Sequence, residues 1–312
     1  MTAADDLIAD DLIRPFQIEG IGIRGRLVRL GPAIDDILCR HGYPDKVSHI
    51  LGQAVALSAA LAGALKFDGL FTLQTKGDGP VPVLVADFRS PGELRGYAQF
   101  APDALAALDD DPEPPSVPRL LGAGHIAFTV DQGPDTDRYQ GIVALEGRTL
   151  ADCAHNYFRS SEQIETAIRL TAGRVPGGAD HGQWRAGAIM LQRLPEGDPS
   201  LLARGAEAER DAASEDDWRR AVVLLASARD DELLDRALPA DDLLFRLFHE
   251  DGVRAFAPVP LAAGCRCSTE RADSVLRRLP VEELRELAVA GELEMTCEFC
   301  NAHYAFPLDR YL

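Results

Sequence analysis

The stretch CRCSTERADSVLRRLPVEELRELAVAGELEMTCEFC, residues 265–300, contains four of the six cysteines of the chain. Cys265 and Cys267 form a C-x-C pair, and Cys297 and Cys300 form a C-x-x-C pair after 29 intervening residues. In an extended chain, residues i and i+2 point to the same face, so both sulfurs of the first pair can approach one ion. Four soft thiolates suit a tetrahedral zinc ion. The spacing therefore predicts one Zn²⁺ per chain at these four cysteines.

The segment between the two pairs is expected to fold back and return the chain to the metal. Two apolar stripes at helical spacing predict two short helices, one ended by Pro280 and one by Gly291. Their members are Ala272, Val275, Leu276 and Leu279, then Val281, Leu284, Leu287 and Ala288. Strands at residues 293–296 and 302–306 are expected to place the second cysteine pair on the turn between them.

Four cysteines saturate a zinc ion, whereas a catalytic zinc keeps one position open for water. Hydrolase chemistry is therefore not expected, and the chain is not predicted to be an enzyme. His303 lies near the second pair and is interpreted as a surface histidine rather than a spare ligand. Cys39 and Cys153 fall in predicted helices and are expected to be buried, inert thiols.

The cysteine module, at about fifty residues, is too small to be stabilised comfortably by its own core. Zinc binding supplies roughly 10–16 kcal/mol of apparent folding energy in such modules, and oxidation of the thiolates would remove it. The two close pairs allow disulfides Cys265–Cys267 and Cys297–Cys300. Four cysteines permit three connectivities, however, and the sequence does not choose among them. From spacing alone, a permanent structural zinc site is the simpler alternative to a redox switch.

The first 195 residues are predicted to form an α+β domain, in which an antiparallel sheet packs with helices. Short β-rich or alternating runs indicate strands at residues 21–30, 70–76, 81–88, 126–131, 139–145, 164–170 and 184–192. The turn at residues 77–80 predicts a hairpin, and the Gly-rich turn at 176–182 predicts antiparallel pairing of the last two strands. Helices are expected at residues 46–65 and 150–158. Alanines and glycines crowd the first of these and would let a sheet or helix approach closely.

Residues 196–255 are predicted to be a charged helical linker, and residues 256–312 the zinc module. Ser214 with Asp217 resembles a helix N-cap signal. Helices are expected at residues 218–228, 231–238 and 241–248, with an apolar stripe that must dock on another surface. An ordinary helical subdomain and a mobile linker explain this composition equally well.

The chain of 312 residues has a formal net charge of −18. Such a polyanion, without a basic patch, is not expected to bind nucleic acid or an anionic membrane. Its N-terminal residues are acidic and lack the apolar core of a secretory signal. Residues 50–65 are the most apolar stretch but are shorter than a membrane span. The protein is therefore expected in the cytosol, where thiols stay reduced.

Several motifs together resemble the redox-regulated 33-kilodalton heat-shock chaperonins, a bacterial family of holdases, over nearly the whole chain. The redox-domain motif comprises the four cysteines with Ser268, Asn301, Tyr304 and Phe306. The entry to it is Leu247-Phe248-His249-Glu250 with Val253-Arg254. In the core the matching residues are Leu94-Arg95-Gly96-Tyr97, Tyr139-Gln140-Gly141-Ile142-Val143, Tyr157, Ser161-Glu162-Gln163-Ile164 and Thr166. Glu165 stands where the family usually has proline, which questions the rigidity of the strand at residues 163–170. Tyr157, Ser160 and Gln163 are interpreted as packing or capping residues.

The resemblance implies that the reduced chain holds zinc and is idle. Oxidants combined with heat would drive disulfide formation and zinc release, and the module and the linker would lose structure. The activated chain would form homodimers and bind unfolded client proteins without ATP, which agrees with the lack of a G-x-x-x-x-G-K-[ST] phosphate loop.

Two other functions compete with this hypothesis. A thiol-disulfide oxidoreductase would use Cys297 and Cys300, but such motifs begin a helix, whereas here the pair follows a predicted strand. A zinc-ribbon module could bind nucleic acid, but arginines and glutamates are balanced around the cysteines. Measured reductase turnover and a salt-sensitive gel shift would reveal these two functions.

Overall fold

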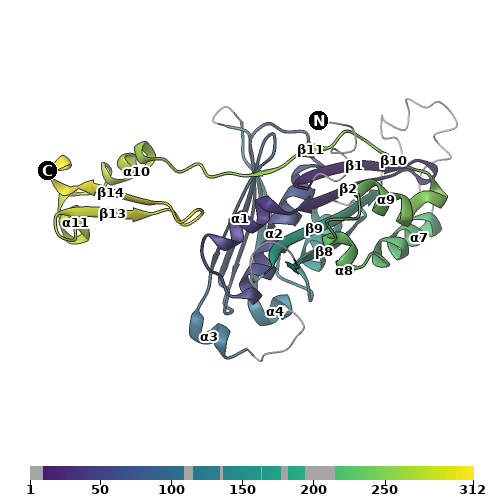
Figure 1. The fold of residues 1–312 in the computed structure, drawn as a ribbon, viewed down its shortest axis with the longest axis horizontal. Helices are drawn as coiled ribbons and strands as arrows, with labels where there is room; N and C mark the ends of the chain where they lie inside the picture. The colour runs from purple at the N-terminus through teal and green to yellow at the C-terminus, as the bar shows by residue number, and fades with distance from the viewer. Residues whose placement is uncertain (1–9, 109–114, 134–135, 163, 177–181, 194–214) are drawn as a thin grey trace.

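The computed structural model describes residues 10–108, 115–133, 136–162, 164–176, 182–193 and 215–312. Two six-stranded sheets form its core (Figure 1). The first sheet has the order β10-β1-β2-β9-β8, with β11 also on β1, and the second has the order β12-β5-β4-β3-β6-β7. Every neighbouring pair is antiparallel except β12 with β5. The predicted α+β class is confirmed.

The strands of the first sheet are β1 (Leu12–Ile18), β2 (Ile23–Leu30), β8 (Thr166–Val175), β9 (Gln183–Arg193), β10 (Val253–Ala255) and β11 (Val259–Pro260). Those of the second are β3 (Leu70–Gly77), β4 (Val83–Arg89), β5 (Glu93–Gln99), β6 (Gly124–Asp131), β7 (Tyr139–Ala144) and β12 (Ala262–Ala263). The hairpin at residues 77–80 and the antiparallel pairing of β8 with β9 are confirmed. Residues 177–181 of the expected turn, Gln163 and Ser214 lie outside the described residues.

Helix α2 (Asp45–Ala62) lies between the two sheets, with α1 (Pro32–Cys39) beside it. It packs against β4 and β5 of the second sheet and against β8 and β9 of the first. A side chain at Gly52 would come within 2.9 Å of the Ala172 Cβ atom. The predicted close approach of a sheet to this Ala- and Gly-rich helix is therefore confirmed. The shorter helices α3 (Pro102–Ala106) and α4 (Val117–Leu120) lie between β5 and β6 of the second sheet, and α5 (Leu150–Tyr157) lies in the connection from β7 to β8 of the first sheet.

Five strands escaped the sequence reasoning: β1, β5 and the short strands β10, β11 and β12. β1 contains Pro15, a residue that argues against a strand. β5 contains Gly96, which weakens a strand pattern. The glycine is required there because an added Cβ atom would lie 2.9 Å from Val55 of α2. At Glu165, where rigidity was in question, the carbonyl accepts the Arg193 amide at 3.0 Å, and the carboxylate pairs with the Arg193 guanidinium at 2.5 Å.

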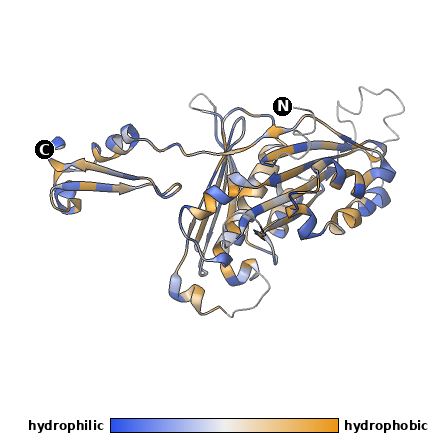
Figure 2. Cartoon of the chain, in the orientation of Figure 1, coloured by the Kyte–Doolittle hydropathy of each residue, from blue (hydrophilic) through white to orange (hydrophobic). Residues whose placement is uncertain are grey.

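Three linker helices cover the face of the first sheet that turns away from α2. They are α7 (Glu215–Ala226), α8 (Asp230–Leu234) and α9 (Ala240–Phe248). Hydrophobic and hydrophilic residues alternate along α7 and α9, as expected of helices with one apolar face (Figure 2). Buried residues of the sheet in this layer include Phe16, Ile23 and Ile189, and those of the helices include Trp218 and Leu244. The expected docking of the apolar stripe is confirmed.

The contact between sheet and linker combines aromatic stacking with a buried cation. Phe16 stacks on Phe248 at 5.8 Å between ring centroids, and its ring lies flat over Gly25 of the neighbouring strand. Arg29 is 3% exposed and donates to the carbonyls of Glu232, at 3.0 Å, Asp235, at 3.1 Å, and Leu238. Burial lowers the pKa of Arg29 to about 10. The predicted helix at residues 231–238 is wrong in its second half, because α8 ends at Leu234 and the chain turns there over Arg29.

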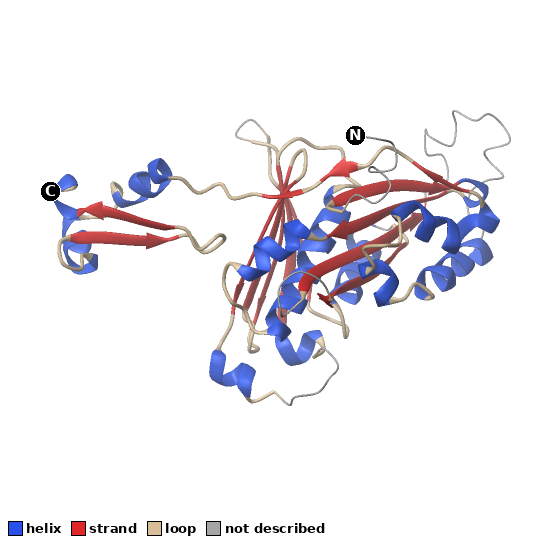
Figure 3. Ribbon diagram, in the orientation of Figure 1, coloured by secondary structure: helices blue, strands red, loops and turns tan. Residues whose placement is uncertain are grey.

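The C-terminal module forms a separate lobe (Figure 3). It comprises α10 (Thr269–Leu276), α11 (Val281–Leu287) and a hairpin of β13 (Glu292–Thr296) with β14 (His303–Pro307). Its buried core is small: Ala272, Leu276, Leu284, Leu293 and Phe306. Val275 and Leu287, expected in the apolar stripes, are 48% and 58% exposed. Strands β10, β11 and β12 pair with the two sheets before α10, so β11 and β12, within the predicted module, belong to the sheets of the core; the division at residue 256 remains a prediction. No helix within the described ranges has the length and apolar character needed to cross a membrane.

Candidate metal centre

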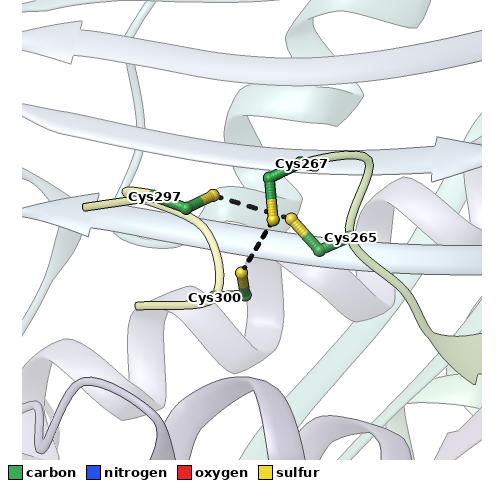
Figure 4. Close-up of side chains that lie close together, drawn as sticks. All are labelled: Cys265, Cys267, Cys297 and Cys300. Atoms are coloured by element: carbon green, nitrogen blue, oxygen red, sulfur yellow. Dashed lines mark hydrogen bonds between the residues drawn. The ribbon is translucent and has the colours of Figure 1, made fainter. Parts of the chain in front are cut away.

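Two loops bring the four cysteine sulfurs together (Figure 4). Cys265 and Cys267 follow β12, and Cys297 and Cys300 lie on the turn between β13 and β14. All four Sγ atoms lie within 4.8 Å of one another, with 3.7 Å from Cys265 to Cys297 and 3.2 Å from Cys267 to Cys300. Sulfurs bound to zinc at about 2.3 Å in a tetrahedron are about 3.8 Å apart. The donor set and its dimensions therefore fit a zinc ion.

Local hydrogen bonds shape both loops. The Cys297 amide donates to the Ala302 carbonyl at 2.9 Å, and the Asn301 amide donates to the Cys297 carbonyl at 2.8 Å. Asn301 has a φ of 57°, a left-handed conformation that asparagine tolerates and a tight turn requires. On the other loop, Ser268 caps α10 by accepting the Arg271 amide at 3.2 Å. These bonds fix the directions of the cysteine side chains.

The four free thiols are half-buried. Burial opposes ionisation of Cys265, but hydrogen bonds from the Cys267 amide and from the other three thiols outweigh it and lower its pKa to about 7. Burial, together with the neighbouring thiols, raises the pKa of Cys300 to about 12. Burial also raises the pKa of Cys297. One thiolate thus forms near neutral pH, and a divalent cation would favour deprotonation of the others.

The remaining cysteines and His303 lie away from the cluster. Cys153 is fully buried, as expected, and burial raises the pKa of its thiol to about 11. The expectation for Cys39 is wrong: it lies in α1 but is exposed, because the buried face of that helix is formed by Ala33, Ile34, Ile37 and Leu38. His303 is exposed and its Nδ1 atom lies 2.9 Å from the Thr296 hydroxyl.

These exposures predict different reactivities for the two outlying thiols. In the folded protein we expect a thiol reagent at pH 8 to label Cys39 within minutes and to leave Cys153 unlabelled until the chain unfolds. Mass spectrometry of tryptic peptides measures both. Cys39→Ser should abolish the fast label outside the 265–300 peptides, whereas rapid labelling of Cys153 in the native protein would contradict its burial.

Two residues of the core motifs, Tyr157 and Ser160, make local structural contacts. Tyr157 is 4% exposed, and its hydroxyl lies 2.9 Å from that of Tyr139 and donates to Glu162 at 2.7 Å. Ser160 donates to the Asn156 carbonyl at 2.7 Å. Packing explains Tyr157, as interpreted from the sequence, while Ser160 bonds back to the preceding helix instead of capping a new one.

Sequence reasoning missed how the cysteine loops contact the core. Arg266, inside the C-x-C pair, lies 2.8 Å from the Asp87 carboxylate of β4. Phe299, inside the C-x-x-C pair, packs under the Arg95 guanidinium of β5, which lies 3.6 Å from the ring centroid. The one signal for this contact in the sequence was Phe299 itself. A tight metal-binding turn does not need a large aromatic side chain, so its presence there indicates that the turn packs against another surface.

The chain matches the family model described as Hsp33 protein over residues 11–307. The chain belongs to the Hsp33 family. It is 44% identical over 306 residues to the 33 kDa chaperonin of Caulobacter vibrioides, covering 97% of this chain and 96% of that one. It is 33% identical over 297 residues to the 33 kDa chaperonin of Escherichia coli, covering 95% and 92%. The resemblance stated from the sequence is therefore confirmed, and the chain is a chaperone of a non-enzyme family.

A solved structure agrees on the fold. The Hsp33 homologue of Thermotoga maritima superposes with a TM-score of 0.75 and 22% sequence identity, covering 97% of each chain. The four clustered cysteines could hold a metal ion, and the sulfur geometry given above is consistent with zinc.

Proposed function

We propose that this chain is a redox-regulated, ATP-independent holdase, which binds unfolded proteins under oxidative and heat stress. The observation that carries the proposal is the gathering of four half-buried free thiols, all within 4.8 Å, on a lobe with only five buried core residues. Such a lobe depends on a bound ion for its stability. Cys265, Cys267, Cys297 and Cys300 would hold one Zn²⁺ in the reduced, idle form.

The bound ion would supply coordination energy and keep the four sulfurs as thiolates. Oxidation to disulfides removes those ligands. For each disulfide, two thiolates give up two electrons to one peroxide molecule, which takes up two protons and leaves as two water molecules. We propose the pairs Cys265–Cys267 and Cys297–Cys300. In the structure Cys265 Sγ lies 3.7 Å from Cys297 Sγ and Cys267 Sγ lies 3.2 Å from Cys300 Sγ, so pairs between the two loops compete and peptide mapping of the oxidised chain has to decide the connectivity.

Loss of the module's structure would reach the linker through the chain that joins them. Strands β10 and β11 lie between α9 and the module and pair with the edge of β1 through only a few residues. Once the module unfolds, these short pairings lose their support, and α7–α9 can leave the first sheet. The surface uncovered contains Phe16, Ile23 and Leu27. When the linker leaves, Arg29 would exchange its three carbonyl acceptors for water. Release of the linker would therefore leave no buried, unpaired cation.

The uncovered apolar face is the proposed binding surface for unfolded clients and for a second oxidised copy in a homodimer. We place the protein in the cytoplasm, since a zinc–thiolate switch requires a reducing compartment at rest. With a net charge of −18, neither nucleic acid nor membrane is proposed as a partner. The cysteine turn follows β13 rather than beginning a helix, which disfavours the oxidoreductase alternative.

One experiment tests the proposal directly. Reduced, zinc-loaded protein is treated with peroxide at elevated temperature, and zinc release and light scattering of a thermally unfolding client are followed together. We expect about one zinc per chain to leave, and client aggregation to fall only in the oxidised sample. If zinc stays bound, or leaves with no gain in aggregation suppression, the site is a permanent structural zinc site rather than a redox switch. A Cys39→Ser variant serves as the control, because its exposed thiol lies outside the cluster.

A further inference from the structure

Both cysteine loops touch the second sheet through the residues that the cysteines enclose. Arg266 donates to Asp87 at 2.8 Å, and the Phe299 ring lies under the Arg95 guanidinium and 6.1 Å from the Tyr97 ring centroid. Asp87 and Arg95 are direct neighbours across β4 and β5. Gly96 faces α2, so Arg95 and Tyr97 point to the opposite face of the sheet. The metal loops thus contact the outer face of the second sheet.

Further contacts extend this surface on either side. The Asn301 side-chain amide donates to the Arg40 carbonyl at 3.2 Å, and Glu298 hydrogen-bonds to Tyr97. The Gly264 amide, one residue before Cys265, donates to the Leu94 carbonyl of β5 at 2.8 Å. The C-x-C loop is therefore tied to β5 by its backbone as well as by Arg266.

The charges at this contact allow the module to leave without damaging the core. Asp87 is 4% exposed and accepts hydrogen bonds from Thr72 at 2.6 Å and from Arg95 at 2.7 Å, in addition to Arg266. If Arg266 departs, the buried carboxylate keeps two partners within its own sheet. No uncompensated buried charge results, which is the usual large cost of breaking a buried ion pair.

We infer that Arg266 and Phe299 on the module, with Asp87, Arg95 and Tyr97 on the sheet, form a latch that sets how readily the metal site opens. The inference rests on the proposed redox function and adds its regulation. Each latch residue of the module is adjacent in sequence to at least one cysteine, so docking and sulfur geometry are set by the same two short loops. Coupling of this kind is reciprocal: if closure of the metal site favours docking, docking favours closure by the same factor.

Because the coupling is reciprocal, a change on the sheet side of the latch should also affect the metal site. Such a change tests the latch without altering the cysteine loops. Tyr97 lies 200 residues before Cys297 in sequence and belongs to none of the cysteine loops. We expect Tyr97→Ala and Phe299→Ala each to speed zinc transfer to a chromophoric chelator about tenfold, both with peroxide and in the reduced protein. The double variant should be no faster than the faster single variant, because either change already opens the latch. Arg266→Gln is a second module-side variant that keeps the loop length.

Two exposed residues provide matched controls. Ile142, on β7 at the other end of the second sheet, is 56% exposed, and Leu287, on α11, is 58% exposed. Alanine at either position should leave zinc transfer at the wild-type rate. The latch is refuted if Tyr97→Ala releases zinc at that rate, or if the two single effects multiply in the double variant. Failure of the chaperone proposal would be seen separately, as zinc release without aggregation suppression, because zinc transfer needs no client.

Discussion

Cys297→Ser is expected to empty the metal site and unfold the C-terminal module while both sheets stay folded. Zinc supplies roughly 10–16 kcal/mol of apparent folding energy in modules of this kind, and a serine hydroxyl is a poor substitute for a soft thiolate. The five buried residues of the module cannot replace that contribution. Hydrogen exchange should show fast exchange throughout β13 and β14 and unchanged protection in β3 and β4, and metal analysis should find far less than one zinc per chain.

The matched control for this variant is Cys39→Ser, which makes the same chemical change at an exposed position outside the cluster. It should keep one zinc per chain and the exchange pattern of the wild type. Removal of zinc from the wild-type protein by a strong chelator should reproduce the exchange pattern of Cys297→Ser. Slow exchange in β13 and β14 of a zinc-free variant would show that the module folds without the ion, and the switch would then lose its physical basis.

The cysteine cluster was predictable from the sequence because its information is local. Two short motifs supply all four cysteines, and the turn between β13 and β14 follows from strand signals on either side of Cys297 and Cys300. The surface on which the cysteine loops dock was not predictable, because Arg266 contacts Asp87, which lies 179 residues away in the sequence. A single sequence gives no signal for such a pair. The contact of the Arg95 guanidinium with the Phe299 ring was equally unpredictable, because arginine and phenylalanine are common on unrelated surfaces.

For the rest of the fold, periodicity predicted most of the strands. It also predicted that the linker helices must dock on another surface, but it did not identify that surface as the first sheet. Pro15 concealed β1, and Gly96 concealed β5, although each is accommodated by its particular neighbours. Cys39 falls in a predicted helix and was expected to be buried. The buried stripe of α1, however, ends one residue earlier at Leu38, and the next position turns outward. Long-range packing decides these positions.

Phe248→Ala is expected to make the reduced, zinc-bound protein suppress client aggregation without any oxidant. The Phe248 side chain is fully buried, and its ring stacks on Phe16 at the centre of the contact between α9 and the first sheet. Truncating such a phenylalanine costs about 3–5 kcal/mol, a large part of the roughly 5–15 kcal/mol that stabilises a typical domain. The loss falls on the linker layer, because the core between the two sheets is a separate cluster around α2.

Phe245 provides a control on the same helix, since it is the same residue type and is 63% exposed. Phe245→Ala should leave the linker docked and the reduced protein idle. Light scattering of an unfolding client, with zinc content measured in the same samples, compares the two variants. If hydrogen exchange shows α7–α9 open in Phe248→Ala and the reduced protein still fails to hold clients, the face under the linker is not the client surface. If it holds clients with zinc bound, linker release is sufficient, and the metal site acts only as the trigger for that release.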